Sequence, residues 1–289
     1  MPCSGYAKAK KTLGRTSRMT EQSRIQSLLD KYQLSPKKSF GQNFLINDGI
    51  LNRIVKGRDI PSFDTVIEIG PGLGSRTTRI QPLAKKLVCV DADRDRVAVL
   101  NDLFKDKENT TIINSDFLRF DPDTCSKKET RLRIGNLPYN ITSELLKYRL
   151  EKGFKSAGVR VQKEVADKLI YEPDKKTDTP LGAYLKRTSE VTILTFVDRS
   201  CFNPVPKVDS AFIRIDHKKD VTIRALSILT ALFRDPNKTR NNCLKNVFGK
   251  EFPLCLSEET RNRLSYRARQ LSADELEKIC LDVDHHIVR

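Results

Sequence analysis

The chain is poor in the residues that build metal sites and histidine-based active sites. Its seven cysteines are scattered without a C-x-x-C pair, which argues for reduced thiols in an intracellular protein and against a zinc site. The three histidines, His217, His285 and His286, all lie late in the chain. A mechanism that needs a histidine base earlier in the sequence therefore finds little support, and we expect no metal.

Long apolar runs are also missing. None approaches the ~20 residues needed to span a bilayer. A content of 38% hydrophobic and 31% charged residues describes a soluble globular protein without a membrane partner. The length of 289 residues allows one large domain, or one large and one small domain. We expect a cytoplasmic monomer, with an organellar or nucleolar location left open.

Acidic residues are scarce relative to basic ones, above all at the start. The net charge of +16 points to a polyanionic partner, with nucleic acid as the strongest candidate. Residues 1–60 hold twelve Lys and Arg against four Asp and Glu, and the first nineteen residues hold no acid. We interpret residues 1–20 as a disordered basic arm, although such a start is also typical of an organelle transit peptide.

The stretch TVIEIGPGLG organises the rest of the chain. Its apolar first half predicts a short strand, and Gly70, Gly72 and Gly74 follow at alternate positions. A strand that ends in a Gly-rich turn before a helix, here expected over 75–83, leaves bare backbone facing a ligand. The pattern led by Glu68 differs from the dinucleotide fingerprint G-x-G-x-x-G. It matches the nucleoside-binding turn of Rossmann-like S-adenosylmethionine (SAM) methyltransferases.

Carboxylates follow the next two predicted strands. Residues 87–90 are apolar and lead to Asp91, where such folds place a carboxylate that accepts hydrogen bonds from two ribose hydroxyls. Residues 111–116 form the third predicted strand and end in Asp116, which is placed to accept from the exocyclic amine of an adenine. Phe117 could contact the adenine ring. The sequence therefore predicts an adenosine-binding edge of the sheet.

The fourth predicted strand leads into Asn136, Leu137, Pro138 and Tyr139, and this loop carries the chemistry. The N6 amine of adenine is a poor nucleophile because its lone pair is delocalised into the ring. The side-chain oxygen of Asn136 and the carbonyl of Leu137 or Pro138 can accept its two N–H bonds and draw the nitrogen towards tetrahedral geometry. Tyr139 can stack on the adenine ring. Alignment and hydrogen bonding then help the amine react, and no strong proton acceptor is required.

The remaining pattern predicts two domains: a Rossmann-like α/β SAM-binding domain with a mostly parallel sheet at 21–217, and a small all-helical, RNA-contacting domain at 218–289. Helices are expected over 21–32, 48–55, 93–103, 223–233, 239–248, 257–264 and 273–279, and a strand hairpin over 190–196 and 211–215. The basic start of the helix over 239–248 suits phosphate contacts or forms a solvated face. The amides of the loop before residue 48 could cap that helix or contact a ligand.

Together these segments resemble the KsgA-type ribosomal RNA adenine N6-dimethyltransferases. The matching segments are FGQNFL at 40–45, EIGPGLG at 68–74, Asp91, Asp116, GNLPYNI at 135–141, VQKEVA at 161–166 and FNPVPKVDSA at 202–211. The resemblance implies that Asn136 and Tyr139 hold the target adenine and that Phe202 stacks from the opposite side. A core aromatic at a strand end is the alternative for Phe202.

The candidate residues follow from the motifs and the resemblance. Those for SAM are Gln42, Asn43, Leu45, Glu68, Gly70, Gly72, Asp91, Asp116, Phe117 and Asn136. Those for RNA are Lys37, Lys38, Lys207, Lys238, Arg240 and Lys245. The implied reaction is SAM-dependent dimethylation of two adjacent adenines near the 3′ end of small-subunit ribosomal RNA, within an immature ribosomal subunit and during ribosome biogenesis.

The sequence departs from the family pattern at two places, and two alternative functions remain open. PLGA at 180–183 replaces the Arg-Leu-Ser usual in such enzymes, which puts local RNA contacts in doubt. The short link from Leu150 to Val161 suggests a trimmed helix or loop. The rivals are an Erm-type enzyme of large-subunit RNA, and a non-catalytic assembly factor or mitochondrial transcription factor on the same fold.

Overall fold

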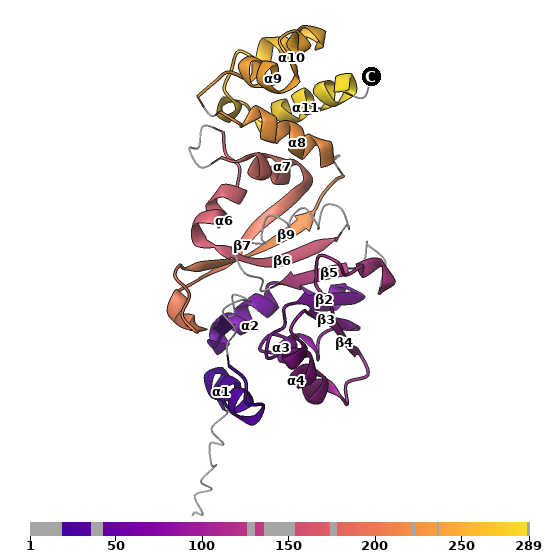
Figure 1. The fold of residues 1–289 in the computed structure, drawn as a ribbon, viewed down its shortest axis with the longest axis vertical. Coiled ribbons are helices and arrows are strands. Elements are labelled where there is room, and N and C mark those ends of the chain that lie inside the picture. The colour runs from indigo at the N-terminus through magenta and orange to yellow at the C-terminus, as the bar shows by residue number, and fades with distance from the viewer. Residues whose placement is uncertain are drawn as a thin grey trace, which may run out of the picture.

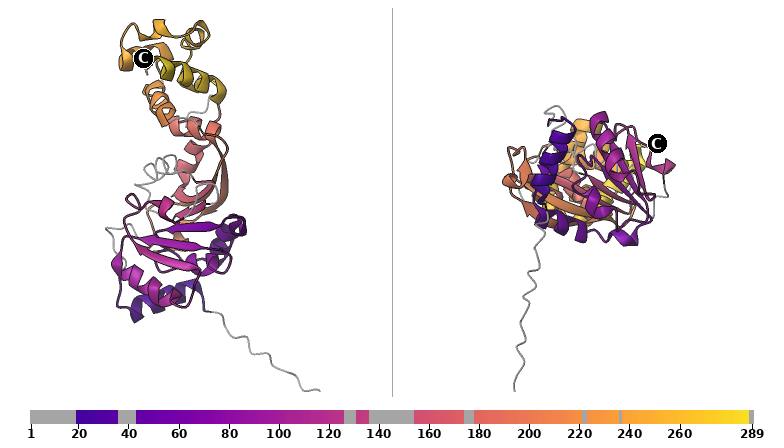
Figure 2. Two further views of the ribbon diagram at one scale, coloured as in Figure 1. Left: turned by 90° about the vertical axis from the view of Figure 1, so that its right-hand side faces the viewer. Right: turned by 90° about the horizontal axis from the view of Figure 1, so that it is seen from below.

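The computed structural model describes residues 19–35, 43–125, 131–135, 154–173, 178–220, 223–235 and 237–287. Figure 1 shows an elongated molecule, with the sheet and the N-terminal helices at one end and the C-terminal helices at the other. The turned views in Figure 2 agree with this arrangement. In the described part of the chain, no helix is long and apolar enough to cross a membrane.

The described strands are β1 Phe44–Leu45, β2 Thr65–Ile69, β3 Leu87–Asp91, β4 Thr110–Asn114, β5 Arg131–Gly135, β6 Ser156–Gln162, β7 Ser189–Val197, β8 Phe202–Asn203 and β9 Ser210–His217. Seven of these form one sheet in the order β4-β3-β2-β5-β6-β9-β7. The five strands from β4 to β6 run parallel, and β9 is antiparallel to both of its neighbours. The predicted mostly parallel sheet and its terminal hairpin are confirmed.

The described α-helices are α1 Glu21–Lys31, α2 Asp48–Lys56, α3 Thr77–Ile80, α4 Arg94–Phe104, α6 Lys163–Leu169, α7 Pro180–Thr188, α8 Ile223–Leu232, α9 Arg240–Phe248, α10 Glu258–Arg263 and α11 Ala273–Ile287. Short 3-10 helices are η2 Ile60–Ser62, η3 Pro122–Thr124, η6 Arg199–Cys201, η7 Phe252–Cys255 and η8 Ala268–Gln270. All residues of β2 and β3 are buried, as expected of parallel strands covered on both faces.

One predicted helix is much shorter than expected. The segment 75–83 contains only the single turn α3, which ends at Ile80. Pro82 explains the early end, because proline has no backbone N–H to donate to the Thr78 carbonyl and so cannot continue the helix. The glycine turn therefore leads into a short helix, and the chain returns quickly to β3.

Two elements were missed in the sequence. Strand β6 was not predicted, because the buried Arg160 interrupts its apolar pattern, and the VQKEVA motif contains its end and the start of α6. The segment PLGA begins α7, whose Thr179 caps the helix by accepting from the Gly182 N–H at 3.0 Å. A Cβ on Gly182 would lie 2.6 Å from the Lys168 carbonyl oxygen, so glycine permits the close approach of α6 and α7.

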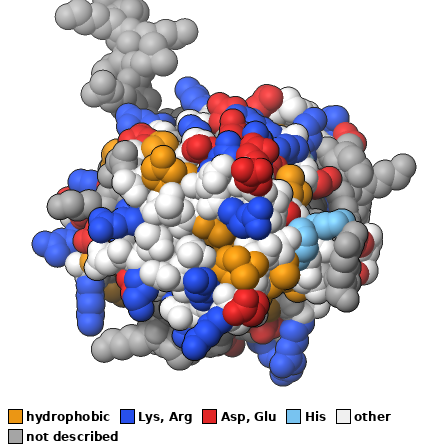
Figure 3. All heavy atoms as spheres, turned by 90° about the horizontal axis from the view of Figure 1, so that it is seen from above, with side chains coloured by type: hydrophobic (Ala, Val, Ile, Leu, Met, Phe, Trp, Pro, Cys, Tyr) orange, Lys and Arg blue, Asp and Glu red, His pale blue; other side chains and the backbone are white. Residues whose placement is uncertain are grey.

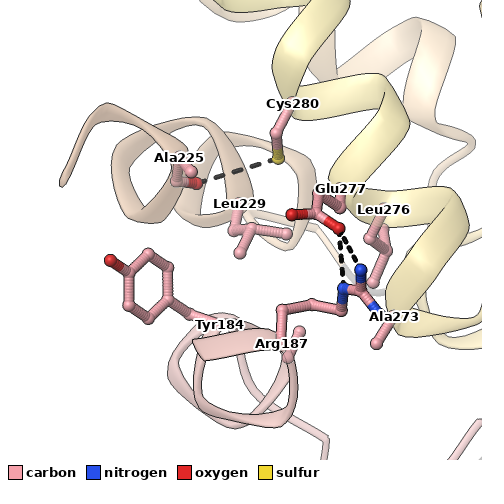
Figure 4. Close-up of a pocket in the computed structure, with 9 residues that line it drawn as sticks. Tyr184, Arg187, Ala225, Leu229, Ala273, Leu276, Glu277 and Cys280 are labelled. Carbon is pink, nitrogen blue, oxygen red and sulfur yellow. Dashed lines mark hydrogen bonds and ion pairs between the residues drawn. The ribbon is translucent and has the colours of Figure 1, made fainter. Parts of the chain in front are cut away.

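The sheet meets the C-terminal helices where α7 packs on α8 and α11 (Figure 4). Arg187 of α7 forms an ion pair with Glu277 of α11, which Figure 4 marks with dashed lines. The void between the three helices has a volume of about 10 Å³, scarcely room for one water. Burial raises the pKa of the Cys280 thiol there to about 12, so this thiol is inert at neutral pH. The junction is packed rather than built to hold a ligand.

Arg58, in the segment after α2, is a fully buried cation. None of its three guanidinium nitrogens has a hydrogen-bond partner among the described residues. The guanidinium lies over Gly158 of β6, where an added Cβ would be 1.3 Å from Nη1. Burial lowers the pKa of Arg58 to about 9, and the charges of Arg76 and Arg214 act in the same direction. The missing side chain at Gly158 thus leaves the space that Arg58 fills.

We expect Arg58→Met to raise the free energy of unfolding by at least about 1 kcal/mol, because an apolar side chain replaces a buried, unpaired charge. The gain should be full below pH 9 and shrink above it. There the native wild type releases its proton, while Arg58 of the unfolded chain keeps its proton to a much higher pH, at the ordinary arginine pKa. Urea unfolding at neutral pH and above pH 9 measures both effects. A less stable Arg58→Met variant would contradict this account.

Candidate active site

The three glycines of the turn after β2 all have positive φ: 61° at Gly70, 62° at Gly72 and 79° at Gly74. Residues with a Cβ rarely adopt this backbone conformation, so the glycines are required by the turn. An added Cβ on Gly72 would lie 3.3 Å from the ring of Phe44, and one on Gly74 would lie 3.4 Å from Leu100. The turn is therefore a close-packed backbone loop at the carboxyl end of β2, as the sequence predicted.

Glu68 lies beneath this turn rather than on its open side. Its side chain is 0% exposed, and its Oε1 accepts from Nε of Arg76 at 3.1 Å. Its Oε2 accepts from the Thr77 hydroxyl at 2.7 Å. Burial raises the pKa of Glu68, and the Arg76 charge and the Thr77 hydroxyl oppose that shift. The structure thus gives Glu68 a supporting role, fixing the start of α3 to β2, instead of the predicted SAM contact.

Asp91, the last residue of β3, joins the glycine turn to the start of α4. Its Oδ1 accepts from the Asp93 N–H at 2.9 Å and its Oδ2 from the Gly72 N–H at 3.4 Å. Burial raises the pKa of Asp91, while Arg96 and the two N–H groups act in the opposite direction. Asp93 caps α4 by accepting from the Asp95 N–H at 3.2 Å. The SAM contact of Asp91 stays a prediction.

Two short strands bring three predicted motifs together. Phe44 and Leu45 of β1 pair antiparallel with Asn203 and Phe202 of β8, respectively. Phe44 also packs on Gly72, and the guanidinium carbon of Arg96 lies 5.3 Å from the centroid of its ring. The FGQNFL motif, the glycine turn and the FNPVP motif therefore meet at one end of the sheet, although 158 positions separate Phe44 from Phe202 in the chain.

Helix α1 covers the outside of the turn. Its apolar face packs with Phe44, Leu73 and Val99 in one cluster. Arg24 of α1 donates to the Leu73 carbonyl at 2.9 Å, inside the glycine turn itself. Sequence reasoning found α1 but gave it no role at the site. The basic charge of Arg24 was the available signal, and its carbonyl partner could only be seen in the fold.

The end of β4 agrees in part with the prediction. Asp116 is exposed two residues after the strand, and its Oδ1 accepts from the Leu118 N–H at 3.0 Å. Its Oδ2 has no hydrogen-bond partner among the described residues. Phe117 is 6% exposed and belongs to the main core cluster, so only a small part of it can reach a ligand. Asp116 therefore presents an exposed carboxylate whose contact with adenine stays a prediction, and Phe117 mainly supports the sheet.

Phe202 is a core residue in the structure. Its ring is 1% exposed and packs with Leu45, Ile54 and Phe212, while the guanidinium carbon of Arg160 lies 4.9 Å from its centroid. A ring enclosed in this way offers no face to a target base. The structure favours the alternative reading of a core aromatic at a strand end, and the buried Leu45 shares that core instead of lining an open pocket. The role of both residues is to hold β1 against β8.

The basic candidates separate into two kinds. Lys207, Lys238 and Lys245 are exposed, and Lys238 forms an ion pair with Asp235 at 3.5 Å. Arg240 is 0% exposed and donates to the backbone carbonyls of Asp235 and Lys238, so its predicted phosphate contact is wrong in this arrangement. Figure 3 looks at the end of the molecule that carries the C-terminal helices, and it shows basic and acidic side chains interspersed on this face. Residues 218–289 hold 14 Lys and Arg against 10 Asp and Glu, so most of the excess charge lies elsewhere.

Several predicted residues lie outside the described part of the chain. These are the loop Asn136, Leu137, Pro138 and Tyr139, the cofactor candidate Gln42, the RNA candidates Lys37 and Lys38, and nearly all of the basic arm. Asn43 is described and half-buried next to β1. The described residues fit SAM: a backbone turn without Cβ atoms, a carboxylate at the end of β3, and an exposed carboxylate after β4.

Comparison with known proteins decides the family. The family model for ribosomal RNA adenine dimethylase matches residues 33–279. The chain belongs to this family. Its match covers both the sheet and the C-terminal helices. With the family shown, the sequence-based predictions of an rRNA adenine dimethyltransferase and of SAM as its cofactor are confirmed.

Curated members of the family are similar along most of their length. Ribosomal RNA small subunit methyltransferase A of Levilactobacillus brevis is 34% identical over 266 residues, which cover 88% of this chain and 90% of that protein. The protein of the same name from Clostridium botulinum strain Loch Maree is 32% identical over 229 residues, or 76% and 83% of the two chains.

Solved structures agree on the fold. A dimethyladenosine transferase from Plasmodium falciparum has a TM-score of 0.71 at 26% identity, covering 83% of this chain and 96% of its own. The 23S rRNA methyltransferase ErmE has a TM-score of 0.64 at 22% identity, covering 84% and 100%, respectively. At that identity the likeness to ErmE concerns the fold alone.

Proposed function

We propose that this rRNA adenine dimethyltransferase acts on the small subunit, methylating N6 of two adjacent adenines near the 3′ end of its RNA within an immature particle. The observation that carries the proposal is the meeting of the glycine turn, Asp91 and the β1–β8 pair at the carboxyl end of the parallel strands. Relatives that match 76% and 88% of this chain are named for the small subunit.

The described residues would divide the work as follows. The Asp91 carboxylate would accept from the ribose hydroxyls of SAM, and the exposed Asp116 would accept from its adenine amine. The positive-φ glycines would let the backbone approach the cofactor without a Cβ clash. SAM would supply an electrophilic methyl group without a metal: as the amine nitrogen bonds to the methyl carbon, the C–S bond would break, S-adenosylhomocysteine would leave, and the nitrogen would lose a proton to solvent.

The target base would be held by residues of the loop after β5. In the proposal, Asn136 and a carbonyl of Leu137 or Pro138 accept the two N–H bonds of the adenine amine, and Tyr139 stacks on the ring. The base must leave its stack for this contact, so the substrate is an accessible strand rather than a continuous duplex. Exposed Lys207, Lys238 and Lys245 would contact phosphates, as the basic composition suggests.

Methyl transfer to purified particles tests the proposal. Labelled SAM is incubated with immature small subunits that lack the adenine modification, and with large subunits in parallel. We expect dimethyladenine in small-subunit RNA, with less label when Asn136→Ala replaces the wild type. Label only in large-subunit RNA would move the protein to the Erm-type activity. Tight subunit binding without any label would leave a non-catalytic assembly factor.

A further inference from the structure

Phe196 is an exposed aromatic side chain at the end of an edge strand. It is 49% exposed and stands one residue before the end of β7, the last strand in the order of the sheet. Thr195 and Val197 on either side of it are buried, so a shift of one residue in the strand would have put the Phe196 ring on the buried face instead. Neither the SAM site nor the described core requires an exposed ring here.

A β-bulge turns the ring outward. Ile193 pairs with Ile213 and Thr195 with Phe212, so Leu194 is an extra residue in β7. An extra residue reverses which face each following side chain takes. Without it, Phe196 would lie on the face of the sheet that packs on α2, next to the core of Phe202. With it, the ring lies on the face that packs on α6.

Contacts on both faces agree with this register. The side chain of Leu194 points towards α2, where it would lie 2.9 Å from an added Cβ on Gly57. The Thr195 hydroxyl accepts from Arg53 of α2 at 3.3 Å. On the opposite face, Nζ of Lys163, the first residue of α6, lies 5.5 Å from the centroid of the Phe196 ring. Bulges that re-aim a side chain are common next to active sites.

Lys163 lies beside the ring, and hydrogen bonds through Asp209 connect it to two further cations, Arg199 and Lys207. The Lys163 N–H donates to the Asp209 carbonyl at 3.0 Å, the Arg199 N–H donates to the Asp209 carboxylate at 3.1 Å, and Nη1 of Arg199 donates to the Lys207 carbonyl at 3.4 Å. Lys163, Arg199 and Lys207 are exposed and form no ion pair among the described residues. We call Phe196 with these three cations the Phe196 platform.

The carboxylates of Asp209 and Asp198 next to the platform accept hydrogen bonds from backbone N–H groups. The Asp209 carboxylate accepts from the Arg199 N–H, and that of Asp198 accepts from the Ser200 N–H at 2.8 Å. Glu164 follows Lys163 on α6, where consecutive residues do not share a face. An aromatic face with unpaired cations beside it suits an unpaired base and its phosphates, because every base can stack and the backbone is anionic.

The position of the platform connects it to the site. β6 and β7 are both antiparallel to β9, so they run in the same direction, and β5 pairs parallel with β6. Phe196 therefore lies at the same end of the sheet as Gly135, the residue before Asn136. Three strand spacings separate β5 from β7, or about 14 Å. Four nucleotides bridge that distance even at the ~3.4 Å rise of a stacked strand.

We propose that the Phe196 platform binds a single-stranded nucleotide that flanks the target adenine, with the base stacked on Phe196 and its phosphates beside Lys163, Arg199 and Lys207. This inference rests on the proposed function, since it names a further part of the same RNA substrate. The bulge in β7 would then serve to expose the Phe196 ring to the RNA. The ring that leaves the core becomes a stacking surface a few nucleotides from the reacting base.

The chain has no tryptophan, so Phe196→Trp introduces a single fluorescent reporter. We expect a short single-stranded oligoadenylate to quench its emission and a duplex of the same length to quench it much less. Leu254→Trp, at a position 62% exposed in η7 of the C-terminal helices, is the matched control and should stay unquenched. Equal quenching at both positions would overturn the proposal, because it would show collision instead of a site.

Affinity for the oligonucleotide separates stacking from general hydrophobic contact. Phe196→Ala and Phe196→Leu should each bind roughly tenfold more weakly, while Phe196→Tyr keeps the wild-type affinity. Lys163→Ala should reduce the slope of log affinity against log salt by about one phosphate contact. Wild-type affinity in both Phe196→Ala and Phe196→Leu would refute the platform.

The same proteins distinguish this inference from the proposed function. SAM binding should be unchanged in every Phe196 variant, since the ring lies away from the glycine turn. If the wild type methylates small subunits but Phe196→Trp is not quenched, the platform fails and the methyltransferase stands. If no methyl transfer occurs but the oligonucleotide quenches only Phe196→Trp, the platform stands and the proposed function fails.

Discussion

Asp91→Ala is expected to raise the Kd for SAM roughly a hundredfold and to reduce methyl transfer accordingly. Hydrogen bonds to a charged acceptor contribute about 1.5–3 kcal/mol each, and the carboxylate would lose two ribose hydroxyls, so the loss is at least about 3 kcal/mol. The substitution also removes the acceptor of the Gly72 and Asp93 N–H groups, which hold the glycine turn against α4. Isothermal titration with SAM measures the effect directly.

Asp93→Ala is the matched control for Asp91→Ala, because it changes an acid two residues away in the same loop. It removes the cap of α4 and should cost about 0.5–2 kcal/mol of stability, with little change in SAM affinity. If both variants weaken SAM binding equally, the loop geometry and not the Asp91 carboxylate carries the binding.

The pH dependence of SAM binding offers a second check on Asp91. Burial holds its pKa above the ordinary value of 3.8, so the carboxylate becomes protonated at a higher pH than a free aspartate. A protonated carboxyl group loses an acceptor for the ribose, and the affinity for SAM should fall as the pH drops through this raised pKa. Arg96→Met should move that fall to higher pH, because the Arg96 charge opposes the shift. An unchanged profile in Arg96→Met would exclude Asp91 as the titrating group.

The parts of the site that could be predicted from sequence are those set by local backbone chemistry. A strand followed by Gly70, Gly72 and Gly74 has few alternatives, because glycine adopts without a steric cost the positive φ that the structure shows at all three. Asp91 could be placed because parallel strands align their carboxyl ends. Both inferences need only the neighbouring residues and the order of the strands.

The errors concern contacts between distant segments. Glu68 was taken for a ligand contact, but its partner is Arg76 beneath the turn, and Phe202 was taken for a stacking ring, but β1 and Arg160 enclose it. Conversely, the exposure of the Phe196 side chain was not predicted, since a regular strand would have buried its ring. A one-residue bulge, invisible in the hydrophobic pattern, places Phe196 on the face of the sheet that packs on α6.

Glu68→Ala is expected to lower the free energy of unfolding by about 3–5 kcal/mol, because it leaves the Arg76 guanidinium buried without its counter-charge. Arg76 is 4% exposed, so water cannot replace the carboxylate. The Thr77 hydroxyl loses its acceptor as well. Urea unfolding followed by circular dichroism measures the change, and SAM should partly restore stability if the variant still binds it.

A double variant separates the charge from the packing. Glu68→Leu with Arg76→Met removes both buried charges and fills similar volume, so its stability should return to within about 1–2 kcal/mol of the wild type or exceed it. Desolvation is the largest influence on the pKa of both groups and disfavours the charged form of each. For this reason we expect the protein to tolerate the loss of both charges together. If the double variant is as unstable as Glu68→Ala, the pair contributes through shape and hydrogen bonding at the turn. In that case the leading acid of the motif would be there for the geometry of the glycine turn, with charge balance secondary.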